Sequence, residues 1–175
     1  MDLEFKNHWE NVYQNKTPEQ VSWTQKIPKT SLDLIAQLNL DTSAKIIDIG
    51  GGDSFLVDHL LELGYQDITV LDISELALKR AKERLGHRAS EVKWIVSDAS
   101  KFKPTEKYDF WHDRAAFHFL TNTNQIGQYL NIAKKAVNGY LTIGTFSEDG
   151  PTRCSGLEIR QYSEAELQAQ FSSGF

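Results

Sequence analysis

Short hydrophobic runs alternate with segments of helical hydrophobic spacing from residue 45 to the end of the chain. The runs are rich in β-branched and aromatic residues, and they predict strands at 45–49, 68–71, 92–96, 108–112 and 140–146. Apolar residues at helical spacing between these runs predict helices at 54–63, 74–85, 124–137 and 163–171. This pattern is typical of strands and helices that follow one another in turn.

Residues at the ends of the helical segments support these boundaries. Ser74 is placed to cap one helix, which Gly86 follows. Ser163 and Glu166 form a capping-box pattern at the start of the last helix. A further short helix, reaching to about residue 40, has Thr30, Ser31 and Asp33 as alternative caps.

The alternation predicts an α/β fold of the Rossmann-like kind, a three-layer sandwich around a mainly parallel sheet with right-handed crossovers. The 175 residues suit one domain over 1–175. We expect an N-terminal helical segment at 1–43 and a core at 44–175. Because ligands bind at the carboxyl ends of such strands, chemistry is expected in the residues that follow each strand.

Composition narrows the functional classes. A formal net charge of −5 and the lack of a dense basic run argue against nucleic-acid binding. The single cysteine, Cys154, rules out a disulfide framework within the chain. The charged N-terminus does not resemble a signal peptide, and the longest uncharged stretch, 115–133, contains His, Asn and Gln. We therefore expect a cytoplasmic protein that does not enter the membrane.

A glycine-rich turn follows the first predicted strand, with the sequence Asp48-Ile49-Gly50-Gly51-Gly52-Asp53-Ser54. Glycines let the backbone turn sharply and approach a ligand. The next helix offers free N–H groups and the positive end of its dipole to a carboxylate-bearing ligand. The alternative is a turn whose glycines serve only the conformation of the backbone.

Acidic residues follow the next two strands. Asp72 lies 22 positions after Gly50, where an acidic residue can accept both ribose hydroxyls of an adenosyl group. Asp98 follows the third strand, where it can accept a hydrogen bond from an adenine amino group. Each aspartate alone can also be read as a turn or capping residue, but together with the glycine turn they favour an adenosyl cofactor.

Nicotinamide and ATP sites fit this sequence poorly. The third glycine of the dinucleotide fingerprint is replaced by Phe55, and no Tyr-x-x-x-Lys pair occurs. The Walker A sequence is also absent.

Residues 46–54, 71–74 and 97–99 resemble the motifs of class I S-adenosylmethionine (SAM)-dependent methyltransferases. The resemblance covers about 44–146. Further segments, His8 to Tyr13, Val21 to Trp23, Asp113 to Leu120 and Phe146 to Leu157, resemble a small bacterial and mitochondrial subgroup related to protein-lysine methyltransferases. The family usually has a further glycine at the position of Ser54.

The resemblance implies a role for each matching residue. The turn Asp48, Gly50, Gly51, Gly52 and Ser54 would hold the methionine end of SAM. Asp72, with Ile73 and Ser74, would hold the ribose, and Asp98 with Ala99 the adenine. Trp23 in the N-terminal segment would cover the cofactor as a lid, and Asp113 would also contact it.

The family sheet usually has seven strands, the last two in an antiparallel hairpin. Phe175 ends the sequence where the sixth strand is expected, so we expect five strands, with the last two of the seven missing. The fifth strand would then be an exposed edge at which a homodimer can form.

Methyl transfer from a sulfonium needs alignment and exclusion of water, and needs a base only if the nucleophile arrives protonated. Among His112, Asp113 and His118 we favour Asp113 and His118 as catalytic residues, because they follow the fourth strand. Packing of His118, or a cap or salt bridge at Asp113, is the alternative for each.

The histidines show no compact ligand spacing, so no metal is expected. Arg153, Cys154 and Arg160 either meet an acidic substrate or belong to a solvated loop. The acceptor, a small molecule or a protein lysine, stays open. A nicotinamide-dependent oxidoreductase and a non-catalytic SAM-binding protein are the alternatives.

Overall fold

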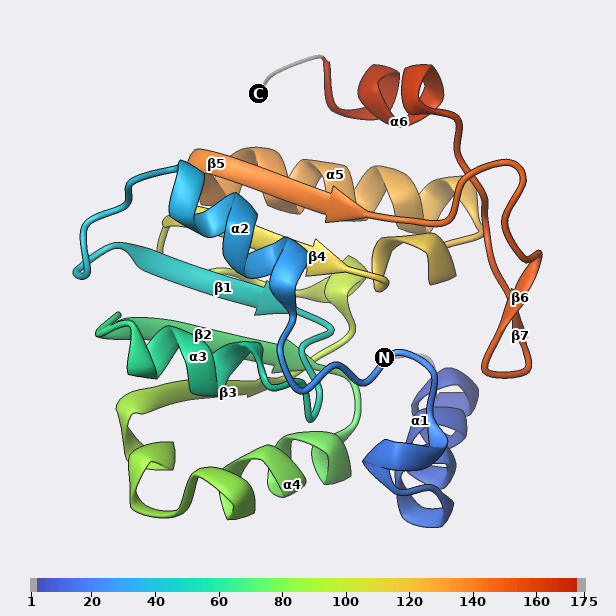
Figure 1. Cartoon of the computed structure of the whole chain (residues 1–175). Coiled ribbons are helices and arrows are strands. Elements are labelled where there is room, and N and C mark those ends of the chain that lie inside the picture. Colours follow the sequence, from blue (N-terminus) through green and yellow to red (C-terminus); the bar gives the residue numbers. More distant parts are fainter. Residues whose placement is uncertain (1–2, 173–175) are drawn as a thin grey trace.

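The computed structural model describes residues 3–172, and a parallel sheet with helices on both faces forms its centre (Figure 1). The helices are α1 (Leu3–Asn15), α2 (Lys29–Gln37), α3 (Leu56–Glu62), α4 (Glu75–Leu85), α5 (Thr123–Ala136) and α6 (Glu164–Phe171). The strands are β1 (Lys45–Ile49), β2 (Asp67–Asp72), β3 (Val92–Val96), β4 (Tyr108–Arg114), β5 (Val137–Gly144), β6 (Arg153–Cys154) and β7 (Leu157–Glu158). Short 3₁₀ turns include η3 (Ala99–Lys101) and η4 (Phe117–Phe119).

The large sheet has the strand order β3-β2-β1-β4-β5, and all its pairings are parallel. Ile46 of β1 lies opposite Ile68 of β2 on one side and Phe110 of β4 on the other. The chain leaves β1 toward β2 and β3 and then returns to the other side of β1 for β4. The strand order therefore reverses next to β1, which is where ligands bind in open parallel sheets.

Alternate residues of each central strand enter separate cores on the two faces of the sheet. Ile46 and Phe110 pack with residues of α2, α3 and α4, whereas Ile47 and Trp111 pack with residues of α5 and η4. This period of two follows from strand geometry. It produces the three layers predicted from the sequence, with a buried sheet between two helical layers.

Several predicted boundaries are confirmed. β1 and β3 have the predicted limits, Ser74 caps α4 by accepting from the Ala77 amide, and Ser163 forms its capping box with Glu166.

Other boundaries were wrong. The N-cap of α2 is Pro28 instead of Thr30, Ser31 or Asp33. β5 begins directly after α5, at Val137, and ends at Gly144. β4 continues through Arg114 instead of ending at His112, since its last residues still pair with β5.

Two elements outside the sheet had no bounds predicted from the sequence, although an N-terminal helical segment was expected at 1–43. α1 presents Phe5, Trp9 and Tyr13 at helical spacing, and Trp9 and Tyr13 are buried. The segment around Cys154 is a β6–β7 hairpin, whose Ser155-Gly156 turn has φ values of 52° and 82°. Positive φ at both positions is typical of the type I′ turn, which connects the two strands of a hairpin through a two-residue loop. Both elements lie at the edge toward which the strands point (Figure 1).

Within residues 3–172, no helix combines the length and apolar character needed to cross a membrane. The predicted exposed edge is present at β5, which pairs only with β4 in the large sheet of the described residues. Tyr140 on this strand is 51% exposed.

Leu60 and Leu63 at the end of α3 give a direct test of the packing. Leu60 is fully buried and Leu63 is 56% exposed. We expect Leu60→Ala to lower the free energy of unfolding by about 3 kcal/mol, because it leaves a cavity. Leu63→Ala should change it by less than about 0.5 kcal/mol. Urea titration of both variants checks this, and equal losses would contradict the packing of α3.

Candidate functional site

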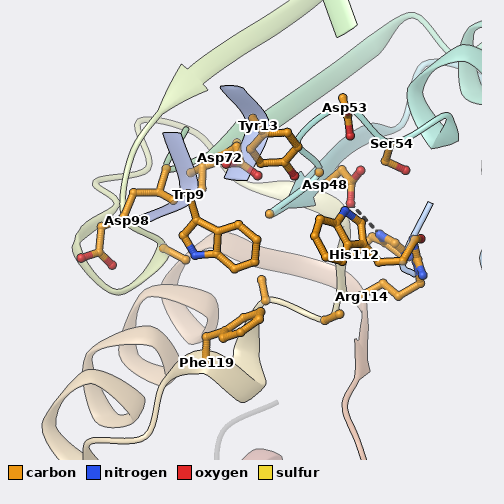
Figure 2. Close-up of a pocket in the computed structure, with 18 of the residues that line it drawn as sticks. Trp9, Tyr13, Asp48, Asp53, Ser54, Asp72, Asp98, His112, Arg114 and Phe119 are labelled. Carbon is orange, nitrogen blue, oxygen red and sulfur yellow. Dashed lines mark hydrogen bonds and ion pairs between the residues drawn. The ribbon is translucent and has the colours of Figure 1, made fainter. Parts of the chain in front are cut away.

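A pocket lies at the carboxyl ends of β1, β2, β3 and β4, and α1 closes one side of it (Figure 2). Asp98 lies toward one end of the pocket and Ser54 and His112 toward the other, with Trp9 between them. Its lining includes most of the residues predicted from the motifs, namely Trp23, Asp48, Gly50, Gly51, Ser54, Asp72, Ile73, Asp98 and Ala99. The parallel sheet brings these residues together from positions spread over 77 places in the sequence, from Trp23 to Ala99.

The glycine turn after β1 has no room for side chains. The amides of Gly50 and Gly51 both donate to the Leu71 carbonyl, at 2.8 and 3.2 Å. A Cβ on Gly51 would lie 2.6 Å from the Asp48 carboxylate, and one on Gly52 would lie 2.6 Å from the Tyr13 hydroxyl. Gly50 and Gly52 also have positive φ, 66° and 51°. Glycine is therefore required here for both conformation and space.

Arg84 of α4 holds the far end of this turn. Its guanidinium donates to the carbonyls of Asp53 and Ser54, at 2.8 and 2.7 Å, and forms an ion pair with Asp58 at 2.7 Å. A planar guanidinium with several fixed donors suits this combined recognition of carbonyl and carboxylate oxygens. The glycine turn is thereby fixed to a helix that follows the next strand.

Asp48 at the floor of the pocket is linked to β4 and α2. Its Oδ1 lies 2.7 Å from Nδ1 of His112, and Nε2 of His112 lies 2.9 Å from the Ser31 hydroxyl. Figure 2 shows the Asp48–His112 pair beside Arg114. Because both His112 nitrogens are engaged, this ring orients the carboxylate and is not available as a base in this arrangement.

Asp72 at the end of β2 is a buried carboxylate in an acidic neighbourhood. Its Oδ1 accepts from the Ser74 amide at 2.8 Å. Burial, and after it the nearby carboxylates of Asp53, Asp48 and Glu10, raise the pKa of Asp72 to about 7 against the lowering effect of that hydrogen bond. Asp72 therefore changes charge near neutral pH in the protein without ligand.

Asp98 lies at the opposite end of the pocket and begins η3. Its Oδ1 accepts from the Ser100 amide and the Ser100 hydroxyl, at 2.9 and 2.7 Å. Asp98 is therefore a capping residue of the turn, which was the alternative considered from the sequence. It also lines the pocket.

Aromatic side chains from the N-terminal segment and from η4 form one wall. The Trp9 ring lies 5.9 Å from that of Trp23 and 5.1 Å from that of Phe119, both nearly perpendicular. Phe5 packs beside Phe119 at 6.2 Å. Edge-to-face packing of this kind is favourable and leaves an apolar surface toward the pocket.

Gly52 and Ser74 were predicted to contact the cofactor, but neither lines the pocket among the described residues. The Tyr13 hydroxyl lies against Gly52. Ser74 is fully buried and donates its hydroxyl to Glu10. Both residues are placed to shape the lining from behind.

Asp113 has a different place from the one predicted. It lies inside β4, is fully buried, and does not line the pocket among the described residues. Its Oδ1 accepts from the amides of Ala116 and Phe117, and its Oδ2 from the Tyr129 hydroxyl at 2.6 Å. Burial raises its pKa to about 6. These contacts fix the turn after β4, so we reassign Asp113 from the reaction and cofactor contact to the support of that turn.

His118 is also buried behind the pocket lining. Neither ring nitrogen has a partner among the described residues, and the ring packs against Phe119 and Phe146. Burial lowers the pKa of His118 to about 4, so the ring is neutral at pH 7. His118 therefore occupies a packing position, which was the alternative considered from the sequence. No contact of its ring supports the predicted role as a base.

Several lining residues were not chosen from the sequence. Tyr13, His112, Arg114 and Cys154 face the pocket with Trp9. The spacing of Phe5, Trp9 and Tyr13 is a helical signal that would have identified α1. No three His, Cys, Asp or Glu side chains within 3–172 gather in a metal-binding arrangement.

The sequence matches the family described as "Methyltransferase domain" over residues 46–138. Curated relatives include the mouse eEF1A lysine and N-terminal methyltransferase, 31% identical over 55% of this chain and 14% of that protein. Another is malonyl-[acyl-carrier protein] O-methyltransferase 2 of Ilyobacter polytropus, 29% identical over 59% of this chain and 40% of that protein. The chain thus matches less than half the length of either relative.

Among solved structures, the fold is similar to a Burkholderia thailandensis 1,6-didemethyltoxoflavin-N1-methyltransferase with bound 1,6-didemethyltoxoflavin and S-adenosylhomocysteine (SAH). The TM-score is 0.74 at 21% identity, covering 97% of this chain and 75% of that chain. This likeness confirms the predicted Rossmann-like fold.

Asp72 gives a prediction for stability against pH. Its folded pKa of about 7 exceeds the ordinary 3.8, so its contribution to stability falls as pH rises from about 4 to about 7. Asp72→Asn removes this loss of about 4 kcal/mol and should raise the melting temperature at pH 8 by about 8–16 °C, with little change at pH 4. Thermal scans at both pH values check this.

Asp33→Asn, at an exposed position, serves as the control and should not reproduce the stabilisation at pH 8. A stabilisation by Asp72→Asn that is equal at both pH values would contradict the raised pKa.

Proposed function

The chain belongs to the methyltransferase-domain family, and from that premise we propose that it transfers the methyl group of SAM to a nucleophilic acceptor. The observation that carries this proposal is the pocket itself. Carboxylates from the ends of β1, β2 and β3 line it beside a turn in which glycine is required. The sequence match to methyltransferases favours methyl transfer over the nicotinamide-dependent alternative.

The lining residues fit SAM by their chemistry. Gly50 and Gly51 line the pocket with backbone, and in this proposal the methionine end lies against them. In this proposal Asp72 with Ile73 receives the ribose hydroxyls, and Asp98 with Ala99 receives the adenine. The carboxylates also suit a ligand that carries positive charge on its sulfonium and amino groups.

SAM supplies an electrophilic methyl group when it is bound. The residues of this chain then align the acceptor and exclude water, which are the main requirements for a displacement of this type. We assign this task to the aromatic wall of Trp9, Trp23 and Phe119. All three side chains line the pocket, and Trp9 is held in place by its burial, with only 9% of it exposed.

Asp113 and His118 contribute to this proposal through their positions. Asp113 holds the amides of Ala116 and Phe117, which precede the Phe119 ring. His118 packs directly against Phe119, with ring centroids 4.4 Å apart. A nucleophile that reaches the pocket with a free lone pair needs no base from the protein.

The acceptor is a small molecule or a protein lysine in this proposal. The names of the mouse and Ilyobacter relatives include both protein and acyl-carrier substrates. The second candidate, a SAM-binding protein without turnover, has the same pocket. Formation of SAH in the presence of small-molecule and lysine-peptide acceptors distinguishes the enzyme from the binder. A cytoplasmic location and a homodimer at the β5 edge stay predictions.

Thermal unfolding with ligands tests the cofactor. SAM or SAH at about 100 times its dissociation constant should stabilise the folded protein by about 2.7 kcal/mol. That corresponds to a rise of about 5–10 °C in melting temperature for a chain of this size. NAD should produce no rise.

Asp72→Asn should lose most of the rise with SAH, because one acceptor oxygen is replaced by a donor. A rise with NAD alone would reject the proposed cofactor.

A further inference from the structure

Glu10 of α1 caps the N-terminus of α4 from outside that helix. Its Oε1 accepts from the Glu75 amide at 2.8 Å. Its Oε2 accepts from the Leu76 amide at 3.1 Å and from the Ser74 hydroxyl at 2.9 Å. The first amides of a helix have no partner within the helix, and a carboxylate there is also favoured by the helix dipole.

Ser74 connects this contact to the pocket. Its hydroxyl donates to Glu10, while its amide donates to Oδ1 of Asp72 at 2.8 Å. Glu10 and Asp72 are therefore held by the same capping residue, one from the N-terminal helix and one from the sheet. A displacement of α1 would remove a partner from the residue that orients the Asp72 carboxylate.

Arg80 forms a second attachment between α4 and α1. Its guanidinium donates to the Tyr13 carbonyl and lies 3.6 Å from the Asp53 carboxylate. The Tyr13 hydroxyl in turn lies against Gly52 of the glycine turn. The two attachments, Glu10 and Arg80, keep Trp9 and Tyr13 at the pocket, where both side chains belong to the lining.

Charge adds to this connection. Asp72 is surrounded by carboxylates from three elements, namely Asp48 on β1, Asp53 in the glycine turn and Glu10 on α1, with the Tyr13 hydroxyl also nearby. Three basic groups face these carboxylates: Arg80 and Arg84 of α4 act on Asp53, and Lys6 of α1 lies 4.0 Å from Oε1 of Glu10. Glu10 is one of the carboxylates that raise the pKa of Asp72 beyond the effect of burial.

We propose that Glu10 is a positioning residue for the cofactor, which fixes α1 to the capping residue of α4 and so couples the aromatic wall to the Asp72 carboxylate. This inference rests on the proposed binding of SAM. It assigns a role to a residue outside the glycine turn and the aspartates that follow the strands. Glu10 itself does not line the pocket among the described residues.

Two substitutions separate the geometric and the electrostatic parts of this role. Glu10→Gln keeps an oxygen that accepts from the α4 amides but removes the charge. Glu10→Ala removes both. Glu75→Gln is the matched control, because it removes an exposed carboxylate from the same helix end without breaking the contact to α1.

The measurement is calorimetric titration with SAH from about pH 5.5 to about pH 8.5, across the range in which Asp72 ionises. Glu10→Ala should bind SAH about tenfold more weakly at the highest pH, because it removes the charged cap that holds Ser74, the donor to Asp72, and one cap contributes about that factor. Glu10→Gln should bind nearly as tightly as the unsubstituted protein at the highest pH. The binding midpoint, meaning the pH at which the affinity for SAH is half of its maximum, should move to lower pH in Glu10→Gln. The reason is that a carboxylate that opposes ionisation of Asp72 is gone.

Melting curves without ligand show whether each variant is folded at the titration temperature. A purely structural role of Glu10 would lower stability but leave the binding midpoint of Glu10→Gln in place. If Glu10→Ala binds SAH with unchanged affinity and the midpoint of Glu10→Gln is also unchanged, the role of Glu10 is overturned, while the proposed binding of SAM still stands. Absence of SAH binding by the unsubstituted protein would overturn the proposed cofactor and this inference together.

Discussion

The arrangement of parallel strands that end at one edge is the constraint on which the site depends. It brings Asp48, Asp72 and Asp98 to the same edge, where burial makes negative charge costly. Much of the surrounding structure supplies compensating donors. His112 faces Asp48, the Ser74 amide serves Asp72, and the Ser100 amide and hydroxyl serve Asp98. A ligand with hydroxyl, amino and cationic groups complements such an edge.

α4 has the widest role in fixing this arrangement. Its first turn binds Glu10 of α1, and its later residues Arg80 and Arg84 bind the N-terminal helix and the glycine turn. One helix thus holds two walls of the pocket that are far apart in the sequence. The protein obtains a defined pocket from contacts behind the lining, where the ligand does not reach.

Local signals predicted the sheet and most of the pocket. Hydrophobic runs and capping residues such as Ser74 act over a few positions, and the topology of parallel strands then places Asp72 and Asp98 near the glycine turn. The misplaced residues depended on longer-range information. β4 continues because it pairs with β5, which moved Asp113 from the predicted loop into the buried sheet. The role of Glu10 requires a helix that begins 65 positions later.

That separation has a consequence for the order in which the molecule acquires its structure. During synthesis α1 emerges before the sheet, and the amides that Glu10 binds are made only after β1 and β2. A short isolated helix is marginal in water, and contacts over long sequence separations form late. The segment that closes one side of the pocket is therefore translated before the sheet, and we expect it to dock only after the sheet has formed. We therefore expect a nascent domain to pass through a stage in which its sheet is assembled and the edge that carries the pocket is still open.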